Sequence, residues 1–232
     1  MQPAKPQVVQ RAHPADVTSV QAENYSSFWI WGGVRPQPVL ARAKSLYILQ
    51  GEVIEQGRQV RLVAQGMTVA QLRRGKVWLV YRTNTLHWTP AITQAVISRL
   101  KLWRLSGNPV IGLQIDFDAG TRYLQNYASF LQRLRDALPD HYQLGITGLL
   151  DWSSNGDIKI INQLKNIVDE VALQTYQGRK TIPDYAVYLK KLDRLTLPFK
   201  IGLIQHGKWQ PVKEVESHPW FRGYIIFLQN ER

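Results

Sequence analysis

The stretch Val110-Ile-Gly-Leu-Gln-Ile-Asp-Phe-Asp-Ala119 is typical of a buried strand that ends in two carboxylates. Side chains alternate along a strand, so Gln114, Asp116 and Asp118 share one face. The opposite face carries only large apolar side chains, those of Leu113, Ile115 and Phe117. Two unpaired carboxylates inside a closed core cost a large desolvation energy. At the C-terminal end of a parallel barrel they would instead line a wet, functional pocket.

The rest of the chain predicts a repeating strand–helix pattern around this stretch. Seven further short apolar segments are expected to be strands: 26–34, 45–50, 76–82, 143–149, 169–176, 199–205 and 223–229. Helical spacing of apolar residues occurs at 91–105, 123–138, 157–167 (with Asp157 as a possible cap) and 185–195, with a short piece at 212–217. The alternation around Gln56-Gly57 predicts a hairpin with 59–64 as its return limb, followed by a turn of helix near 69–73.

Eight strands separated mostly by helices favour an α/β fold, a trimmed (β/α)8 TIM barrel with a β-hairpin excursion after its second strand. We expect a single barrel domain over residues 25–232. Residues 1–24 hold three prolines and little periodicity, which predicts a flexible tail. An open, doubly wound sheet is the rival, but no glycine-rich phosphate loop follows the first strand.

The composition of the chain limits the classes of partner that we expect it to bind. The formal net charge is +12, but the Lys and Arg residues are scattered and no nucleic-acid-binding motif accompanies them, so we expect no nucleic acid partner. No apolar run approaches the ~20 residues of a transmembrane helix. The chain has no cysteine, and nothing in it predicts a metal site or a cofactor. We expect a monomer.

Polar residues gather at the predicted C-terminal ends of the strands. They are Arg82 on the third strand, Asp116 and Asp118 on the fourth, Thr147 and the following Asp151-Trp152 on the fifth, Gln174 and Tyr176 on the sixth, Gln205 and His206 on the seventh, and Gln229, Asn230 and Glu231 on the eighth. Each has a plainer interpretation: His206 as a surface histidine, Glu231 as a frayed terminus, Trp152 and Tyr176 as packing residues. Their joint position favours one site.

Paired carboxylates beside a cleft suit glycoside hydrolysis. Trp and Tyr rings offer apolar platforms with polar edges for sugar rings, and the chain has eight tryptophans. Of Trp29 and Trp31 we expect one to be a core residue and leave the role of the other open.

Four segments carry a family resemblance: 113–118, 127–135, 144–152 and 171–176. They resemble an uncharacterised bacterial family, domain of unknown function 3142, from about Phe28 to the C-terminus. The resemblance implies a TIM barrel of the glycoside-hydrolase type without an established activity. More distantly, the fourth strand is similar to the Asp-x-x-Asp-x-Asp-x-Glu signature of family 18 chitinases. Asp116 and Asp118 match its second and third acids, and Tyr176 resembles the tyrosine of the sixth strand.

The chain departs from that signature at two positions. Leu113 stands where its first Asp belongs, and Gly120 replaces the general-acid Glu. One hypothesis is a glycosidase-like enzyme with Asp116 as stabiliser, Asp118, Asp151 or Glu231 as acid, and Tyr176 as a further catalytic residue.

The alternative is a non-catalytic barrel that binds an oligo- or polysaccharide, and the positive charge favours an anionic one. In both, the substrate-binding candidates are Gln174, Trp152, Arg82, His206 and Glu231. Arg82 could also neutralise the acid pair and make it structural. A metal hydrolase built on Asp116, Asp118 and His206 is less favoured, because no ligand spacing typical of metal sites occurs. Sugar chemistry favours a periplasmic or exported location, with an export signal already removed.

Overall fold

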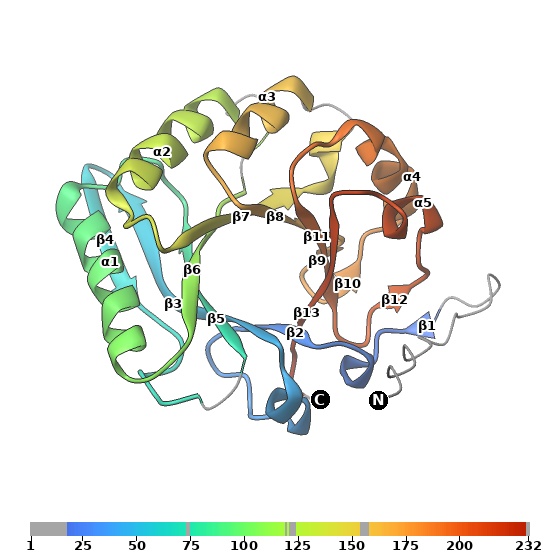
Figure 1. Ribbon diagram of the computed structural model, residues 1–232, viewed down its shortest axis with the longest axis horizontal. Coiled ribbons are helices and arrows are strands. Elements are labelled where there is room, and N and C mark those ends of the chain that lie inside the picture. The colour runs from blue at the N-terminus through green and yellow to red at the C-terminus, as the bar shows by residue number, and fades with distance from the viewer. Residues whose placement is uncertain (1–17, 73–74, 119, 121–123, 154–157, 231–232) are drawn as a thin grey trace, which may run out of the picture.

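The structure, a computed structural model, is a closed barrel of eight parallel strands surrounded by helices (Figure 1). It describes residues 18–72, 75–118, 120, 124–153 and 158–230. In their order around the barrel, the strands are β2 (Ser27–Ile30), β13 (Phe221–Phe227), β11 (Phe199–Ile204), β8 (Glu170–Gln174), β7 (Gln143–Leu149), β6 (Val110–Asp116), β5 (Lys76–Thr83) and β3 (Ser45–Gln56). Pairing of β2 with β3 closes the ring, so the predicted (β/α)8 barrel is confirmed.

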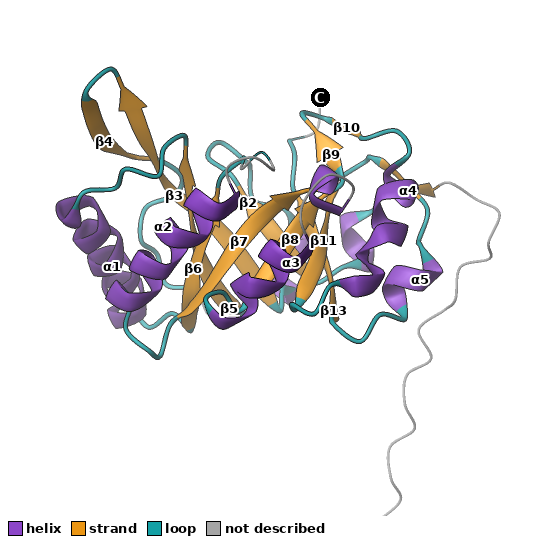
Figure 2. Cartoon of the chain, turned by 90° about the horizontal axis from the view of Figure 1, so that it is seen from above, coloured by secondary structure: helices purple, strands orange, loops and turns teal. Residues whose placement is uncertain are grey.

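The helical layer is uneven around the barrel. Its α-helices are α1 (Pro90–Leu105), α2 (Leu124–Ala137), α3 (Ile158–Gln163), α4 (Tyr185–Leu189) and α5 (Lys213–Glu216). Between β2 and β3 there is only a 3-10 helix, η2 (Pro38–Arg42). β3 continues into a hairpin with β4 (Gln59–Ala64), which projects beyond the strand ends as predicted (Figure 2). No helix in the described ranges is long and apolar enough to cross a membrane.

Three predicted helices differ from the structure. The helix expected at 185–195 changes to 3-10 form, η6 (Lys190–Arg194), after Leu189. The helix expected at 157–167 is α3 followed by η5 (Leu164–Asn166), and its predicted cap, Asp157, lies outside the described residues. Residues 69–72 are not helical, because the Asn108 side chain binds the Ala70 carbonyl and the Leu72 amide in place of helical hydrogen bonds. Residue 73 is outside the described ranges.

The chain joins the folded structure earlier than predicted. Within the expected tail of residues 1–24, β1 (Thr18–Ser19) pairs with β12 (Lys208–Trp209), and η1 (Ala22–Asn24) follows. Val20 and Ala22 are buried in the main core, and the Val20 amide donates to the Gly207 carbonyl. Two apolar side chains in a proline-poor stretch are enough to dock this segment, so the predicted boundary at residue 24 is too late.

Large aromatic side chains fill the inside of the barrel. Trp29, Tyr47 and Trp78 are nearly completely buried and form a cluster separate from the outer core. Two glycines make room for the two indoles: Gly112 on β6, the strand next to that of Trp78, and Gly202 on β11. A Cβ at Gly112 would lie 2.6 Å from Trp78, and one at Gly202 would lie 2.5 Å from Trp29. The barrel is therefore a packed core with a closed floor, not a channel.

A charged cluster lies near the N-terminal ends of the strands. Lys200 Nζ is 3.1 Å from Glu170 Oε2 and donates to Tyr47 Oη at 2.6 Å. Tyr47 in turn donates to Glu170 Oε1 at 2.6 Å. The Lys200 and Glu170 side chains are only 13% and 10% exposed, so each needs the other as a partner.

Lys200→Met is expected to lower the free energy of unfolding by about 3–5 kcal/mol, because it leaves a buried carboxylate without its cation. The matched control is Lys190→Met, which removes a lysine 60% exposed in its pair with Glu214 and should change stability by under about 1 kcal/mol. Urea unfolding measures both. Equal losses in the two variants would contradict a stabilising role for the buried cluster.

Candidate active site

A cavity of about 690 Å³ opens at the C-terminal ends of the strands. Six predicted site residues line it: Arg82, Asp116, Asp118, Asp151, Gln174 and Tyr176. They come from β5, β6 and β8 and from the segments that follow β6, β7 and β8. We call this space the mouth cavity. Its position is that of the active sites of TIM-barrel enzymes.

Asp116 is the buried member of the acid pair. It is the last residue of β6 and only 7% exposed. Its Oδ1 accepts a hydrogen bond from Thr147 Oγ1 at 2.8 Å, and its Oδ2 is 4.0 Å from Arg82 Nε. Burial raises the pKa of Asp116, while the Thr147 hydrogen bond and Arg82 oppose that rise. The structure thus holds a partly desolvated carboxyl group at the cavity floor.

Asp118 is the open member of the pair. Its side chain is 65% exposed, and its Oδ2 lies 3.9 Å from Arg82 Nη2. Arg82 is itself 50% exposed, so its contacts with Asp116 and Asp118 are partly solvated, and both are also long, at 4.0 and 3.9 Å. Such pairs are weak. Arg82 therefore lies beside the two acids without closing them off from the cavity.

Tyr176 contributes a hydroxyl group and an aromatic wall. Burial raises its pKa well above the usual range, and the charges of Asp116 and Asp118 raise it further, so the phenol remains a hydrogen-bond donor at neutral pH. The Tyr176 ring packs on the Phe227 ring with 5.6 Å between centroids, and the Trp31 ring packs on the Phe227 ring with 5.4 Å between centroids. All three residues line the mouth cavity.

Asp151 follows β7 in the short helix η4 (Leu150–Ser153). Its Oδ1 is buried, and no described residue offers it a hydrogen bond. Buried polar atoms in native proteins nearly always have a partner. Asp151 Oδ1 is thus a hydrogen-bond acceptor beside the cavity that could accept a bond from a ligand.

Two of the predicted substrate-binding residues, Trp152 and His206, are not part of the cavity lining. Trp152 is 1% exposed and packs over Gly148, because η4 turns its ring into the core. His206 occupies a left-handed turn (φ 65°), is exposed, and contacts Val20 through its backbone. The interpretation of Trp152 as a sugar platform is therefore wrong, and His206 is a turn residue. Glu231 lies outside the described residues.

Sequence reasoning missed other parts of the site. Trp31 lines the mouth cavity, whereas Trp29 lies inside the barrel and donates to Gln114 Oε1 at 2.7 Å, which settles the open choice between them. Tyr188 also lines the cavity, although its segment was predicted only to be a helix. Glu52, opposite Arg82 on the neighbouring strand, raises the pKa of Asp116. A hairpin of β9 (Tyr176–Gln177) and β10 (Lys180–Thr181) lies at the rim of the mouth cavity. The sequence feature that could have predicted this hairpin is Gly178, which lies at its turn.

The geometry gives no support to the metal-hydrolase hypothesis. Among the described residues, no three His, Cys, Asp or Glu side chains come together in a way that would hold a metal ion. Asp116, Asp118 and His206 therefore do not form the ligand set considered from the sequence.

Comparison with known families confirms the predicted resemblance. Residues 83–196 match the model of the family described as Domain of unknown function (DUF3142). The matched region runs from the end of β5 past α4, so it includes Asp116, Asp118, Asp151, Gln174 and Tyr176. No curated protein sequence matches the chain.

Solved structures share the fold at low sequence identity. The tamarind chitinase-like lectin is 12% identical with a TM-score of 0.54, over 88% of this chain and 94% of the lectin. The chitinase domain of the spore coat protein CotE from Clostridium difficile is 12% identical with a TM-score of 0.52, over 91% of this chain and 74% of that domain. The spore cortex-lytic enzyme SleL from Bacillus cereus is 16% identical with a TM-score of 0.49, over 77% of this chain, which spans only 50% of SleL.

Thr147→Val is expected to raise the pKa of Asp116 further, because it removes a hydrogen bond that stabilises the charged carboxylate. The folded pKa is raised, so the folded protein binds the proton more readily. The free energy of unfolding therefore falls as the pH rises from the unfolded value, about 3.9, through the folded pKa. In Thr147→Val, the fall in the free energy of unfolding should extend to higher pH, because the folded pKa of Asp116 is higher. A 13C NMR titration of the Asp116 carboxyl group, with urea unfolding at low and neutral pH, measures both effects.

The matched control is Thr175→Val, which removes a buried threonine hydroxyl that donates to the neutral Gly202 carbonyl. It should leave the Asp116 titration unchanged. An Asp116 titration in Thr147→Val that coincides with the wild type would show that the Thr147 contact does not act on the charge.

Proposed function

We propose that the mouth cavity binds a carbohydrate. The observation that carries the proposal is the convergence of an acid pair, Tyr176 and the Trp31 side chain on one cavity at the C-terminal end of a TIM barrel. Aromatic rings stack on the apolar faces of sugar rings, and carboxylates accept hydrogen bonds from sugar hydroxyls. Support also comes from the fold, which the chain shares with a chitinase domain and a chitinase-like lectin.

The charges of the cavity favour a neutral or positively charged sugar. Asp116, Asp118 and Asp151 line it against one cation, Arg82, among the described residues. An anionic glycan, expected from the net charge of +12, would meet three carboxyl groups. The charges that line the cavity affect a bound sugar more than the net charge of the whole protein does, because salt screens interactions between surface charges beyond about 10 Å.

Glycoside hydrolysis is the second candidate function, and the raised pKa of Asp116 favours it. A proton donor needs a pKa above the usual value of a carboxyl group, and burial supplies such a rise here. With Gly120 in place of the signature Glu, the cavity offers Asp118 or Asp151 as the second acid. In this function Asp116 or its partner protonates the leaving oxygen as the glycosidic C–O bond breaks, and the other carboxylate stabilises positive charge at the sugar carbon. Water then attacks that carbon and returns a proton to the acid that donated one.

Trp31→Ala is expected to weaken oligosaccharide binding at least about tenfold, the equivalent of about 1.4 kcal/mol, because it removes an aromatic wall of the cavity. Trp220→Ala is the matched control, since Trp220 is also partly exposed but precedes β13 at the opposite end of the barrel. Isothermal titration with a panel of neutral, amino and anionic oligosaccharides measures both. Absence of binding to every member of the panel would refute the proposal.

Asp116→Asn, Asp118→Asn and Asp151→Asn separate hydrolysis from binding. If the barrel hydrolyses its ligand, the wild type releases reducing ends, and at least one variant loses turnover by about 10²-fold or more while it still binds sugar. If it only binds, no variant and no wild-type sample releases reducing ends. Binding of the panel, measured on the same samples, shows that each variant is folded.

A further inference from the structure

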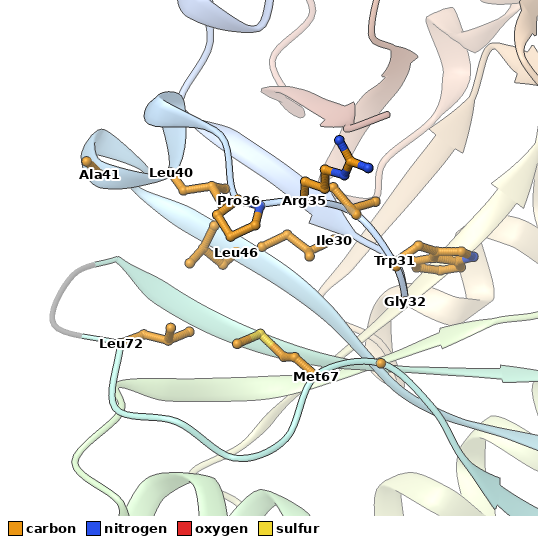
Figure 3. Close-up of a pocket in the computed structure, with 13 residues that line it drawn as sticks. Ile30, Trp31, Gly32, Arg35, Pro36, Leu40, Ala41, Leu46, Met67 and Leu72 are labelled. Atoms are coloured by element: carbon orange, nitrogen blue, oxygen red, sulfur yellow. The ribbon is translucent and has the colours of Figure 1, made fainter. Parts of the chain in front are cut away.

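We propose that a second cavity, on the outside of the barrel, binds the alkyl chain of an anionic amphiphile, with its acidic head group at Arg35. This side cavity (Figure 3) has a volume of about 550 Å³, and neither Asp116 nor Asp118 lines it. Pockets of about 300–1,000 Å³ with apolar walls and few polar groups are typical of small-molecule sites. The proposal does not depend on the proposed function of the mouth cavity.

The side cavity exists because two successive strands lack a covering α-helix. Between β2 and β3 the barrel has only η2, and after β3 it has the β3–β4 hairpin. The outward side chains of Ile30 and Leu46 are therefore covered by irregular segments instead of a packed helix. In Figure 3 these two side chains and Leu40 face Met67 and Leu72 across the open space.

Hydrogen bonds from the residues that follow β13 hold the first wall. Asn230 Nδ2 donates to the Gly33 carbonyl at 2.7 Å, and Asn230 Oδ1 accepts from the Arg35 amide at 2.7 Å. Gln37 Nε2 donates to the Gln229 carbonyl at 2.8 Å. These contacts fix the segment before η2 and prevent it from collapsing onto the barrel.

Two buried polar side chains hold the second wall. Gln50 Nε2 donates to the Met67 carbonyl at 3.0 Å, and Asn108 binds the backbone of Ala70 and Leu72. Gly66 (φ +77°) approaches so closely that a Cβ there would lie 1.8 Å from the Leu49 carbonyl oxygen, so only glycine fits. Both walls are thus preorganised, which distinguishes the side cavity from a chance gap in packing.

The chemistry of the lining selects the ligand. Its large side chains are apolar, and Met67 adds a flexible thioether that adapts to the shape of a chain. Arg35 is the one charged residue of the lining; it is exposed and forms no ion pair with a described residue. A guanidinium group binds carboxylate or phosphate by paired hydrogen bonds. In Figure 3 the Arg35 guanidinium points away from Met67 and Leu72, so the cation lies at the outer end of the slot. An apolar slot with one cation at its outer end fits an alkyl chain that ends in an acid.

Two sources share this chemistry: a free fatty acid, and the lipid of a lipid-linked glycan. Trp31 borders both cavities, so a glycan attached to a chain in the side cavity would have a short path to the acid pair. The experiment below distinguishes the two sources.

The test is isothermal titration with decanoate, dodecanoate, dodecyl phosphate and dodecyl maltoside, each below its micelle concentration, and with maltose. We expect dodecanoate to bind one site, and decanoate to bind about tenfold or more weakly because two methylene groups are lost, at about 0.8 kcal/mol each. Met67→Trp and Leu40→Trp fill the slot and should weaken dodecanoate binding at least tenfold. Leu102→Trp, at an exposed leucine on α1, is the matched control and should bind as the wild type does.

Arg35→Ala should weaken dodecanoate binding but leave dodecyl maltoside unaffected, since the maltoside carries no charge. Tighter binding of dodecyl phosphate than of dodecanoate would assign the ligand to phosphate-headed lipids such as those of lipid-linked glycans, and the reverse order to free fatty acids. Tighter binding of the uncharged maltoside than of both acids would contradict an acidic head group at Arg35. Thermal unfolding checks the fold of each variant, and the chain-length comparison needs no variant. No saturable dodecanoate binding, or equal binding by Met67→Trp, Leu40→Trp and the wild type, would overturn the proposal. Dodecanoate contains no sugar, so this result is separate from the outcome for the mouth cavity.

Discussion

Two indole rings packed against glycines close the barrel from within. Trp29 and Trp78 each occupy the space that a Cβ at Gly202 or Gly112 would need, and Trp29 also donates a hydrogen bond to Gln114. Gln114 precedes Asp116 by two residues on β6 and shares its inward face. This packing therefore fixes the position and direction of Asp116, the buried member of the acid pair. Without a filled interior, the carboxylates would open onto water on both sides and the mouth would have no floor.

Above that floor, two neighbouring acids differ in their exposure to water. Asp116 is buried and its pKa is raised, whereas Asp118 remains largely exposed beside the same arginine. Different environments for two like groups are the usual way in which a protein gives them different roles. The weak, partly solvated contacts with Arg82 leave both acids in the cavity lining. A purely structural ion-pair cluster would instead be dry and closely paired.

Much of this arrangement follows from period-two alternation. The pattern of 110–118 predicted which face Asp116 would occupy, and Gln56-Gly57 predicted the hairpin, because both depend on local geometry. Side chains beyond the strand ends could not be placed in this way. Trp152 and Trp31 both follow a strand, but a 3-10 turn rotates Trp152 into the core while Trp31 remains at the cavity. The same limit applies to His206, whose left-handed turn depends on pairing with residues near the N-terminus.

The most direct test of the central claim is an NMR titration of the 15N-labelled protein with a neutral oligosaccharide. The account predicts shifts at the Trp31 indole N–H and the Gln174 side-chain amide, both at the mouth cavity. It predicts none at the Trp29 indole, which is already bonded to Gln114 inside the barrel. Shifts confined to other surfaces, or no saturable shifts with any sugar, would contradict it.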